Sequence, residues 1–231
     1  MASFISKYSM EILVVIGFVL GMALVWAHHD ALGVRIKGTF GLCILYLSCI
    51  VLSTLLFADL ETFIAYGNIA NGKAVSSLGM YFIGSLVVLL VSMLLKLKTP
   101  VVLDVYGLAV CIGMCVSRFN CIRAGCCGGR EIFDTGLYWP VRTAEVIFHL
   151  TMFFYGWKQV KKGEKPGWFL PLTMLSYGIF RFAVQWLRDT ESAGFVQSHF
   201  WALLSAFIGL SILLELQSQA QRKQKKHAKK K

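Results

Sequence analysis

The chain has 231 residues, of which 57% are hydrophobic and only 15% are charged, and its mean hydropathy is +0.65. A soluble domain carries about a quarter charged residues, so this composition excludes an ordinary water-soluble protein. The formal net charge of +11 comes largely from the carboxyl-terminal tail, Gln221 to Lys231, and therefore does not indicate nucleic-acid binding. The composition predicts an integral membrane protein.

Apolar runs recur along the chain and predict its helices. They cover residues 10–27, 40–58, 78–95, 101–116, 146–155, 168–187 and 200–214. Several reach the roughly 17–25 residues that a helix needs to cross a hydrocarbon core, whereas the fourth and fifth are shorter or polar-edged and could be broken or partly re-entrant. We expect an all-α integral membrane protein with about seven transmembrane helices in residues 1–216, followed by a basic, disordered cytoplasmic tail in residues 217–231.

The distribution of basic residues between the runs predicts the orientation. They gather in alternate connections, at Arg35 and Lys37, at Lys96 and Lys98, at Lys158 to Lys165, and in the tail. An excess of Lys and Arg marks the cytoplasmic side, which places the amino terminus outside and the carboxyl terminus in the cytoplasm. The connection from Arg118 to Arg142 then lies outside although it holds four arginines. We interpret these arginines as ligands of an anion.

Residues 117–129 form the most informative stretch of the chain. Their sequence is Ser-Arg-Phe-Asn-Cys-Ile-Arg-Ala-Gly-Cys-Cys-Gly-Gly, at the end of an apolar run. Charged side chains at membrane depth cost a few kcal/mol each and usually face a cavity or a partner. Glycine lets the backbone bend sharply or approach a ligand closely. This stretch predicts a functional site that includes Arg118, Arg123, Gly125 and Cys126.

The seven cysteines do not predict a disulfide framework or a metal site. Four of them, Cys43, Cys49, Cys111 and Cys115, lie within apolar runs, where cysteine is usually a small buried hydrophobe. The other three are Cys121, Cys126 and Cys127, and no histidine stands at zinc-finger spacing from them. The arginines beside them would favour a reactive thiolate. Packing of small side chains at a tight bend is the other interpretation.

A second group of arginines belongs to the run at 168–187. Arg181 and Arg188 are seven residues apart, so on a helix they share one face about two turns apart, with Gln185 between them. Guanidinium groups bind phosphate in a bidentate manner and stay charged when buried. We therefore expect Arg118, Arg181 and Arg188 to meet around a phospholipid headgroup on the outer side.

Three motifs, in this order along the chain, resemble those of the prolipoprotein diacylglyceryl transferase family of bacterial seven-helix membrane enzymes. Arg118, Gly125 and Gly129 match the arginine and two glycines of the family's central signature. Residues 140–145, Pro-Val-Arg-Thr-Ala-Glu, are similar to its Pro-x-Gln-x-x-Glu motif. Residues 177–188 are similar to its Tyr-Gly-x-x-Arg-Phe-x-x-Glu-x-x-Arg motif, and Asp104 stands where the family usually has an aspartate.

The chain also departs from the family pattern. The family's Ser-x-His-Gly-Gly segment is represented by residues 76–81, Ser-Ser-Leu-Gly-Met-Tyr, which contain no histidine. Cys121 and Ala124 replace the signature asparagines, and Cys126 replaces its glutamate. Arg142 replaces the glutamine of the second motif, and Gln185 replaces the acidic residue of the third. The resemblance is thus to a divergent member that lacks the family histidine.

The resemblance implies a transferase of the bacterial inner membrane that uses a phosphatidylglycerol-like phospholipid donor without a cofactor or metal. The acceptor could be a protein, a saccharide or a lipid, and nucleic acid is not a partner. The implied catalytic residues are Arg118, Glu145 and Arg181, with Glu145 as the first candidate base and Asp104 as the second. The implied substrate-binding residues are Arg123, Gly125, Arg142, Gln185, Arg188 and Cys126.

Two alternatives stay open at this stage. One is a non-catalytic phospholipid-binding or transport protein that keeps the fold. The other is a membrane thiol enzyme in which the Cys126–Cys127 pair carries the reaction.

Overall fold

The computed structural model describes residues 16, 19–21, 23–28, 32, 36–67, 76, 78–125, 127–133, 135–189 and 197–228. Its principal elements are helices: α3 (Ile36–Tyr66), a π-helical turn η1 (Met80–Gly84), α4 (Ser85–Leu94), α5 (Thr99–Ala124), α6 (Val141–Lys162), α7 (Phe169–Gln185) and α8 (Gln197–Ala228). Within the described ranges, β pairing is limited to two isolated bridges. Of the apolar run predicted at 10–27, nine of the eighteen residues lie outside these ranges, and the nine described ones are helical.

Each of the other six predicted runs lies in a helix, which confirms an all-α fold. Among the residues that the structure describes, three segments are long and apolar enough to cross a membrane: Phe40–Ile64, Thr99–Phe119 and Gln197–Arg222. A shorter apolar helix covers Met80–Leu94. The count of seven spans stays a prediction. The fourth and fifth runs belong to unbroken helices of 26 and 22 residues.

The structure describes the tail as a helix up to residue 228, and the disorder expected of residues 217–231 stays a prediction. Helix α8 continues past the end of its apolar segment to Ala228. Gln, Ala, Lys and Arg are all good helix formers. Extending an existing helix also avoids the unfavourable nucleation step, so the basic sequence prolongs α8.

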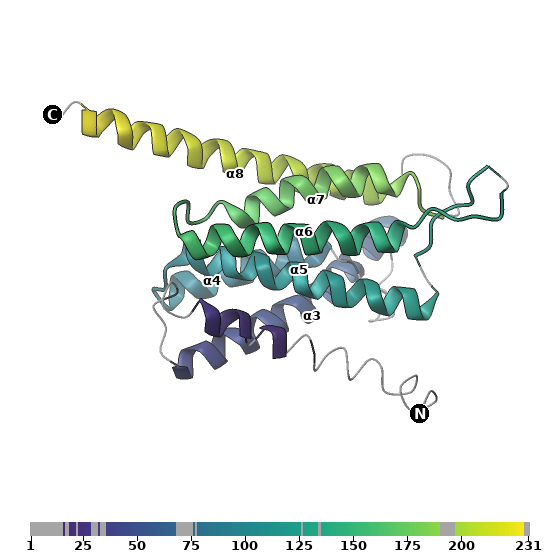
Figure 1. The fold of residues 1–231 in the computed structure, drawn as a ribbon, viewed down its shortest axis with the longest axis horizontal. Coiled ribbons are helices and arrows are strands. Elements are labelled where there is room, and N and C mark those ends of the chain that lie inside the picture. Colours follow the sequence, from purple (N-terminus) through teal and green to yellow (C-terminus); the bar gives the residue numbers. More distant parts are fainter. Residues whose placement is uncertain are drawn as a thin grey trace.

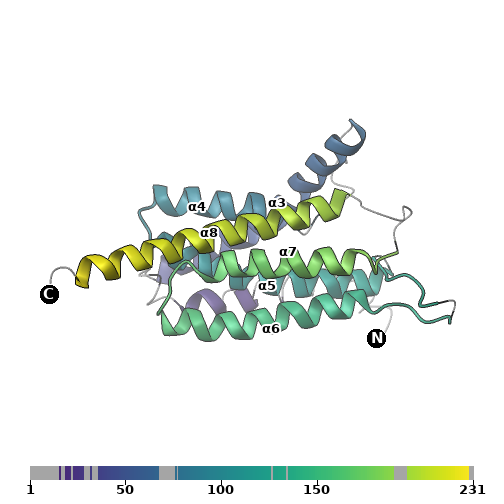
Figure 2. The ribbon, with the colours of Figure 1, turned by 90° about the horizontal axis from the view of Figure 1, so that it is seen from above.

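Helices α5, α6 and α7 run side by side, and α8 lies along α7 (Figures 1 and 2). Glycines let α7 and α8 approach backbone to backbone. A Cβ atom at Gly178 would lie 2.5 Å from the Ala202 carbonyl oxygen, and one at Gly209 would lie 2.5 Å from that of Pro171. Close contact through small residues is the usual way in which membrane helices associate.

The π-helical turn η1 is held by a tyrosine of α5. The Tyr106 hydroxyl donates a hydrogen bond of 2.8 Å to the carbonyl oxygen of Met80. A Cβ atom at Gly84 would meet that hydroxyl, so glycine is required there. The turn carries the buried ring of Tyr81, which stacks on Tyr177 of α7 with ring centroids 5.3 Å apart. Short π-helical turns often occur at functional sites.

Asp104 joins α5 to the beginning of α7. Its Oδ1 accepts the backbone N–H groups of Phe169 and Leu170, at 2.9 and 3.2 Å, and its Oδ2 accepts that of Gly167 at 2.6 Å. The first N–H groups of a helix have no partner within the helix. The carboxylate therefore caps α7 from a neighbouring helix and fixes the axial position of the two helices.

A hairpin projects from the opposite end of the bundle, between α5 and α6 (Figure 1). Its arms pair through the Trp139 N–H and the Arg130 carbonyl oxygen, at 3.1 Å, and the Glu131 carboxylate accepts the N–H of Gly136. Phe133, near the tip, is 91% exposed. The hairpin separates this end of the bundle from the end that Asp104 holds.

Replacing Asp104 with Ala should lower the free energy of unfolding by about 2–4 kcal/mol, because three buried N–H groups lose their acceptor. Asp104→Asn should cost about half as much, since its amide oxygen can still accept from Phe169 and Leu170. Thermal unfolding in detergent measures both changes. Equal stabilities of the two variants would contradict the capping role.

Candidate functional site

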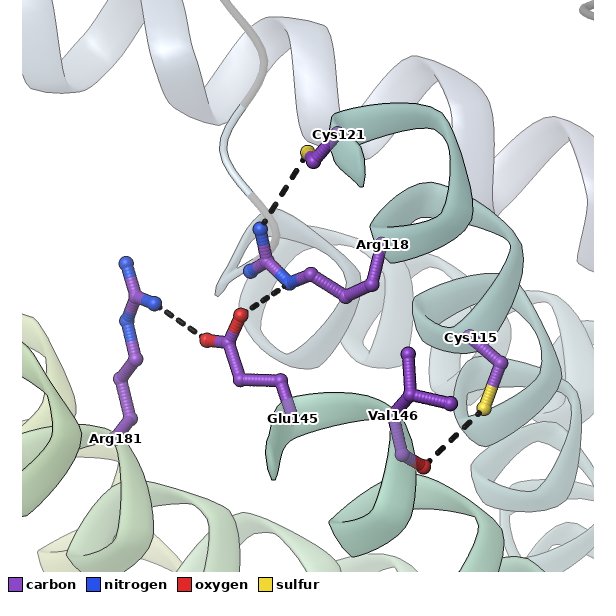
Figure 3. Close-up of polar contacts among 6 residues, drawn as sticks. All are labelled: Cys115, Arg118, Cys121, Glu145, Val146 and Arg181. Atoms are coloured by element: carbon purple, nitrogen blue, oxygen red, sulfur yellow. Dashed lines mark hydrogen bonds and ion pairs between the residues drawn. The ribbon is translucent and has the colours of Figure 1, made fainter. Parts of the chain in front are cut away.

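A buried carboxylate lies between two guanidinium groups at the hairpin end of the bundle (Figure 3). The Glu145 Oε2 is 2.5 Å from Nε of Arg118, and its Oε1 is 2.5 Å from an Nη of Arg181. The three side chains come from α6, α5 and α7, respectively. The structure thus brings together all three residues that the sequence predicted to be catalytic.

The positions of these residues along their helices suit their charges. Arg118 and Arg181 lie near the carboxyl-terminal ends of α5 and α7, and Glu145 lies near the amino-terminal end of α6. Helix dipoles favour cations at carboxyl-terminal ends and anions at amino-terminal ends. Because α6 runs antiparallel to the other two, these favourable ends meet in one place (Figure 1).

Burial makes the pairing of these groups obligatory. The Glu145 side chain is 1% exposed, and those of Arg118 and Arg181 are 5% and 9% exposed. Removing one partner of a buried ion pair leaves an uncompensated charge in a poorly solvated place. Tyr177 adds a side-chain hydrogen bond to the Arg118 guanidinium. Cys121 adds a contact of 3.8 Å between its sulfur and an Nη of Arg118.

Arg188 is a third buried guanidinium, 9% exposed, just beyond the end of α7. Backbone pairing fixes its position: the Arg130 N–H donates to the Leu187 carbonyl oxygen at 2.9 Å, and the Asp189 N–H donates to that of Gly128 at 3.1 Å. Burial lowers the pKa of Arg188, and the like charge of Arg181 lowers it further. An arginine side chain nevertheless stays protonated in proteins.

The carboxylates among the described residues are too few to neutralise the positive charges of these arginines. None of their carboxylates lies within ion-pair distance of the Arg188 guanidinium. Glu61, partly buried near the end of α3, is close enough to Arg181 for the two charges to interact. Even with Glu61 counted, the guanidiniums of Arg118, Arg181 and Arg188 face only two carboxylates. Among the described residues, the cluster therefore has an excess of positive charge.

Two further predicted residues lie close by. Gln185 is buried on the same face of α7 as Arg181, and its Oε1 has no hydrogen-bond partner among the described residues. Arg142 donates a hydrogen bond of 3.0 Å to the carbonyl oxygen of Gly125, so it neutralises the end of α5. The side chain of Arg123 and the whole of Cys126 lie outside the described part of the chain.

The glycines of this stretch shape the backbone. Gly125 ends α5 with φ of 70°, in the left-handed region that glycine adopts without strain. A Cβ atom at Gly129 would lie 2.2 Å from the carbonyl oxygen of Trp139. The glycines were expected to let the backbone approach a ligand closely. The structure shows a close approach at Gly129, but to the backbone of the hairpin. This packing holds the segment that pairs with Arg188.

An open pocket of about 620 Å³ lies beside the end of α5. Its lining consists of Ile122, Gly125, Cys127, Gly128, Gly129, Tyr138, Trp139, Pro140, Val141, Arg142, Thr143 and Asp189. Five of the thirteen residues of the stretch 117–129 and the base of the hairpin thus border one solvent-accessible space. Cys127, with φ of 59°, lines it at a position where the backbone is in the left-handed region.

Asp104 does not belong to this site. It lies 14 residues before Arg118 on α5, which corresponds to about 21 Å along the helix axis. Its two oxygens accept three backbone N–H groups of the α6–α7 connection and α7. The expectation that Asp104 is a second candidate base is therefore wrong, because a carboxylate at the other end of the bundle cannot reach the arginines.

Sequence reasoning assigned no role to His149 or Glu61 and placed Tyr177 only within a motif. His149 follows Glu145 by one helical turn on α6 and is completely buried. Its spacing of four residues from Glu145 was a usable signal, because residues i and i+4 share a helix face. No local pattern places Glu61 near Arg181, since the two residues are brought together only by the fold.

The fold and the site together define a helical membrane protein with a buried, arginine-rich polar centre near one end of its bundle. Residues 4–215 match the family model of prolipoprotein diacylglyceryl transferase. The chain therefore belongs to the prolipoprotein diacylglyceryl transferase family, whose members are multi-pass membrane transferases of lipoprotein biosynthesis. No curated protein matches the chain in a sequence search.

Glu145→Gln should lower the free energy of unfolding by about 3–5 kcal/mol, because it leaves two buried guanidiniums without their shared counter-ion. The matched control is Glu164→Gln, an exposed carboxylate in the connection after α6, which should change stability by less than about 0.5 kcal/mol. Thermal unfolding in detergent measures both. Similar stabilities of the two variants would show that the buried pairs contribute nothing.

Proposed function

We propose that the protein transfers a diacylglyceryl group from a phosphatidylglycerol-like phospholipid to a nucleophilic acceptor, for which a cysteine thiol of a prolipoprotein is the first candidate. The observation that carries this proposal is that guanidinium groups outnumber carboxylates, within the described part of the chain, in the cluster of Arg118, Arg181 and Arg188. A buried excess of guanidinium groups suits a phosphate, which they bind in a bidentate manner. Membership of the transferase family supports a reaction there.

In this reaction the acceptor sulfur attacks the glycerol carbon that carries the phosphate. A carbon–sulfur bond forms, the carbon–oxygen bond to the phosphate breaks, and the glycerol phosphate headgroup leaves with the electron pair. The thiol proton must pass to a base. Negative charge grows on the leaving oxygen, and guanidiniums already in place stabilise it without reorganisation.

Glu145 serves this reaction by positioning the arginines. Both of its oxygens are engaged by guanidinium groups, so neither is directed at an acceptor. The carboxylate holds Arg118 and Arg181 on opposite sides of one point and keeps two like charges close together. Gln185, on the same buried face of α7 as Arg181, and Arg142, which lines the open pocket, are candidates for the rest of the headgroup site. Arg123, Gly125 and Cys126 stay candidates for its border.

The distribution of charge supports a site on the outer side of the inner membrane. The α4–α5 and α6–α7 connections, with Lys96, Lys98 and Lys165, lie at one end of the bundle, since a Cβ atom at Gly167 would lie 3.1 Å from that of Pro100. The basic end of α8 lies at that same end (Figure 1). Basic residues mark the cytoplasmic side, so the cluster and the hairpin face outward and the carboxyl terminus lies in the cytoplasm.

Replacing Arg118, Arg181 or Arg188 singly with Gln should weaken phosphatidylglycerol binding about 10- to 100-fold, because each variant loses a charged hydrogen bond worth about 1.5–3 kcal/mol. Transfer of the diacylglyceryl group to a lipobox peptide, a short peptide that carries the acceptor cysteine of a prolipoprotein, should fall at least as much. The measurements are lipid binding by the purified protein and incorporation of labelled diacylglyceryl into the peptide.

The matched control for these variants is Arg130→Gln, which removes an exposed guanidinium from the hairpin at the same end of the bundle. It should leave binding and transfer within about twofold of wild type. Equal losses in all four variants would mean that only the overall charge matters. Undiminished binding in the three cluster variants would refute the phosphate site.

A thiol enzyme is the second candidate, because the Cys121 sulfur lies 3.8 Å from the Arg118 guanidinium and Cys127 lines the open pocket. A thiolate nucleophile would be stabilised in such surroundings. We expect instead that the double variant Cys126→Ser, Cys127→Ser keeps most of the transferase activity, as does Cys121→Ser. Activity assays and mass spectrometry of the intact protein test this. An inactive but folded variant, with a trapped covalent adduct on one cysteine of the wild type, would favour the thiol enzyme.

A further inference from the structure

His149 is a buried titratable side chain that the reaction described so far does not use. It is 0% exposed, and both of its ring nitrogens lack a hydrogen-bond partner among the described residues. Such atoms are rare in native proteins, because an unsatisfied buried polar group costs free energy. A catalytic or ligand-binding role is one of the few explanations for their retention.

We propose that His149 is the proton acceptor for the transfer reaction, which deepens the proposed function and rests on it. His149 lies on α6 one turn after Glu145 and on the same buried face. Arg118 and Arg181 are close enough for their charges to act on the imidazole. Its ring packs against that of Tyr177, which binds the Arg118 guanidinium, with centroids 4.8 Å apart.

The depth of His149 in the bundle suits this role. Helix α6 begins at the hairpin end, so His149 lies about 6 Å further into the bundle than Glu145. A phospholipid whose phosphate occupies the arginine cluster has its glycerol on the hydrocarbon side of that cluster. An entering sulfur attacks the glycerol carbon from the side opposite the leaving oxygen. The base for that sulfur must therefore lie beyond the carbon, at the depth of His149.

The other candidate bases are poorly placed. Both oxygens of Glu145 are engaged by arginines, and Asp104 is about 21 Å away along α5 from Arg118. The segment that carries a histidine in the family motif has Leu78 at that place in this chain. Its nearest chemistry-bearing residue, Tyr81, stacks on Tyr177 and so reaches the same aromatic group as His149. The imidazole of His149 on α6 thus provides the basic side chain that residues 76–81 lack.

The proton balance is complete with the groups named. The acceptor thiol gives its proton to a neutral ring nitrogen of His149 while the sulfur forms its bond to carbon. The carbon–oxygen bond breaks, and the headgroup phosphate leaves between the arginines with the electron pair. The imidazolium then returns its proton to the departing phosphate or to water, which restores the neutral histidine.

The test compares full-length wild-type protein, His149→Gln, His149→Ala and the control His199→Gln in detergent, with phosphatidylglycerol and a lipobox peptide as substrates. His199 is an equally buried histidine, 1% exposed, on α8. Loss of a general base should lower kcat of both His149 variants at least 100-fold. Binding of phosphatidylglycerol should stay within about threefold of wild type, and His199→Gln should keep its kcat.

Added imidazole should partly restore the His149→Ala rate, and substituted imidazoles of higher pKa should restore it more, which a purely structural histidine would not do. A His149→Gln variant with wild-type kcat would overturn the role of His149 alone. A wild-type protein that transfers nothing would overturn the proposed function and this role with it. If the variants fail to fold, a structure of the wild type with a bound phosphatidylglycerol analogue decides. A glycerol on the side of the arginines away from His149 would overturn the role of His149 as proton acceptor.

Discussion

The shared carboxylate of Glu145 is the interaction on which the rest of the site depends. Two guanidinium groups that lie close together in a poorly solvated interior repel each other strongly, and an anion between them offsets that repulsion. Glu145 is that anion, and its two oxygens determine how far apart Arg118 and Arg181 stand and in which direction each points. Three helices must meet at the correct depth for this to happen. The Asp104 cap at the other end of the bundle fixes the axial position of two of them.

Much of the fold could be predicted from the sequence, because hydropathy alone decides where membrane helices form. The carboxyl-terminal end of α8 could not be predicted. Its predicted apolar run ends at residue 214, but helix propensity is a local property that continues into the basic tail up to Ala228. The π-helical turn that begins at Met80 could not be predicted from the sequence either, because it depends on the hydroxyl of Tyr106 in α5, which lies 26 residues away in the chain.

The site shows a similar division. Arg118, Glu145 and Arg181 could be proposed because each is an ionisable residue in an apolar context, which carries a cost that a function must justify. The role of Glu145 as a linker between arginines could not, because it requires the relative rotation of three helices. Asp104 was assigned to the wrong kind of role for the same reason: a buried carboxylate looks alike in sequence whether it caps a helix or accepts a proton.

The contact between α7 and α8 limits how a lipid can travel. At Gly178 and Gly209 the two backbones are too close for even one added carbon atom. Neither an acyl chain nor a signal-peptide helix fits through that seam unless the helices separate. The phospholipid donor and the product must therefore enter and leave the arginine cluster on another side of the bundle. Helix α8 blocks access along the side of α7, the helix that carries Arg181.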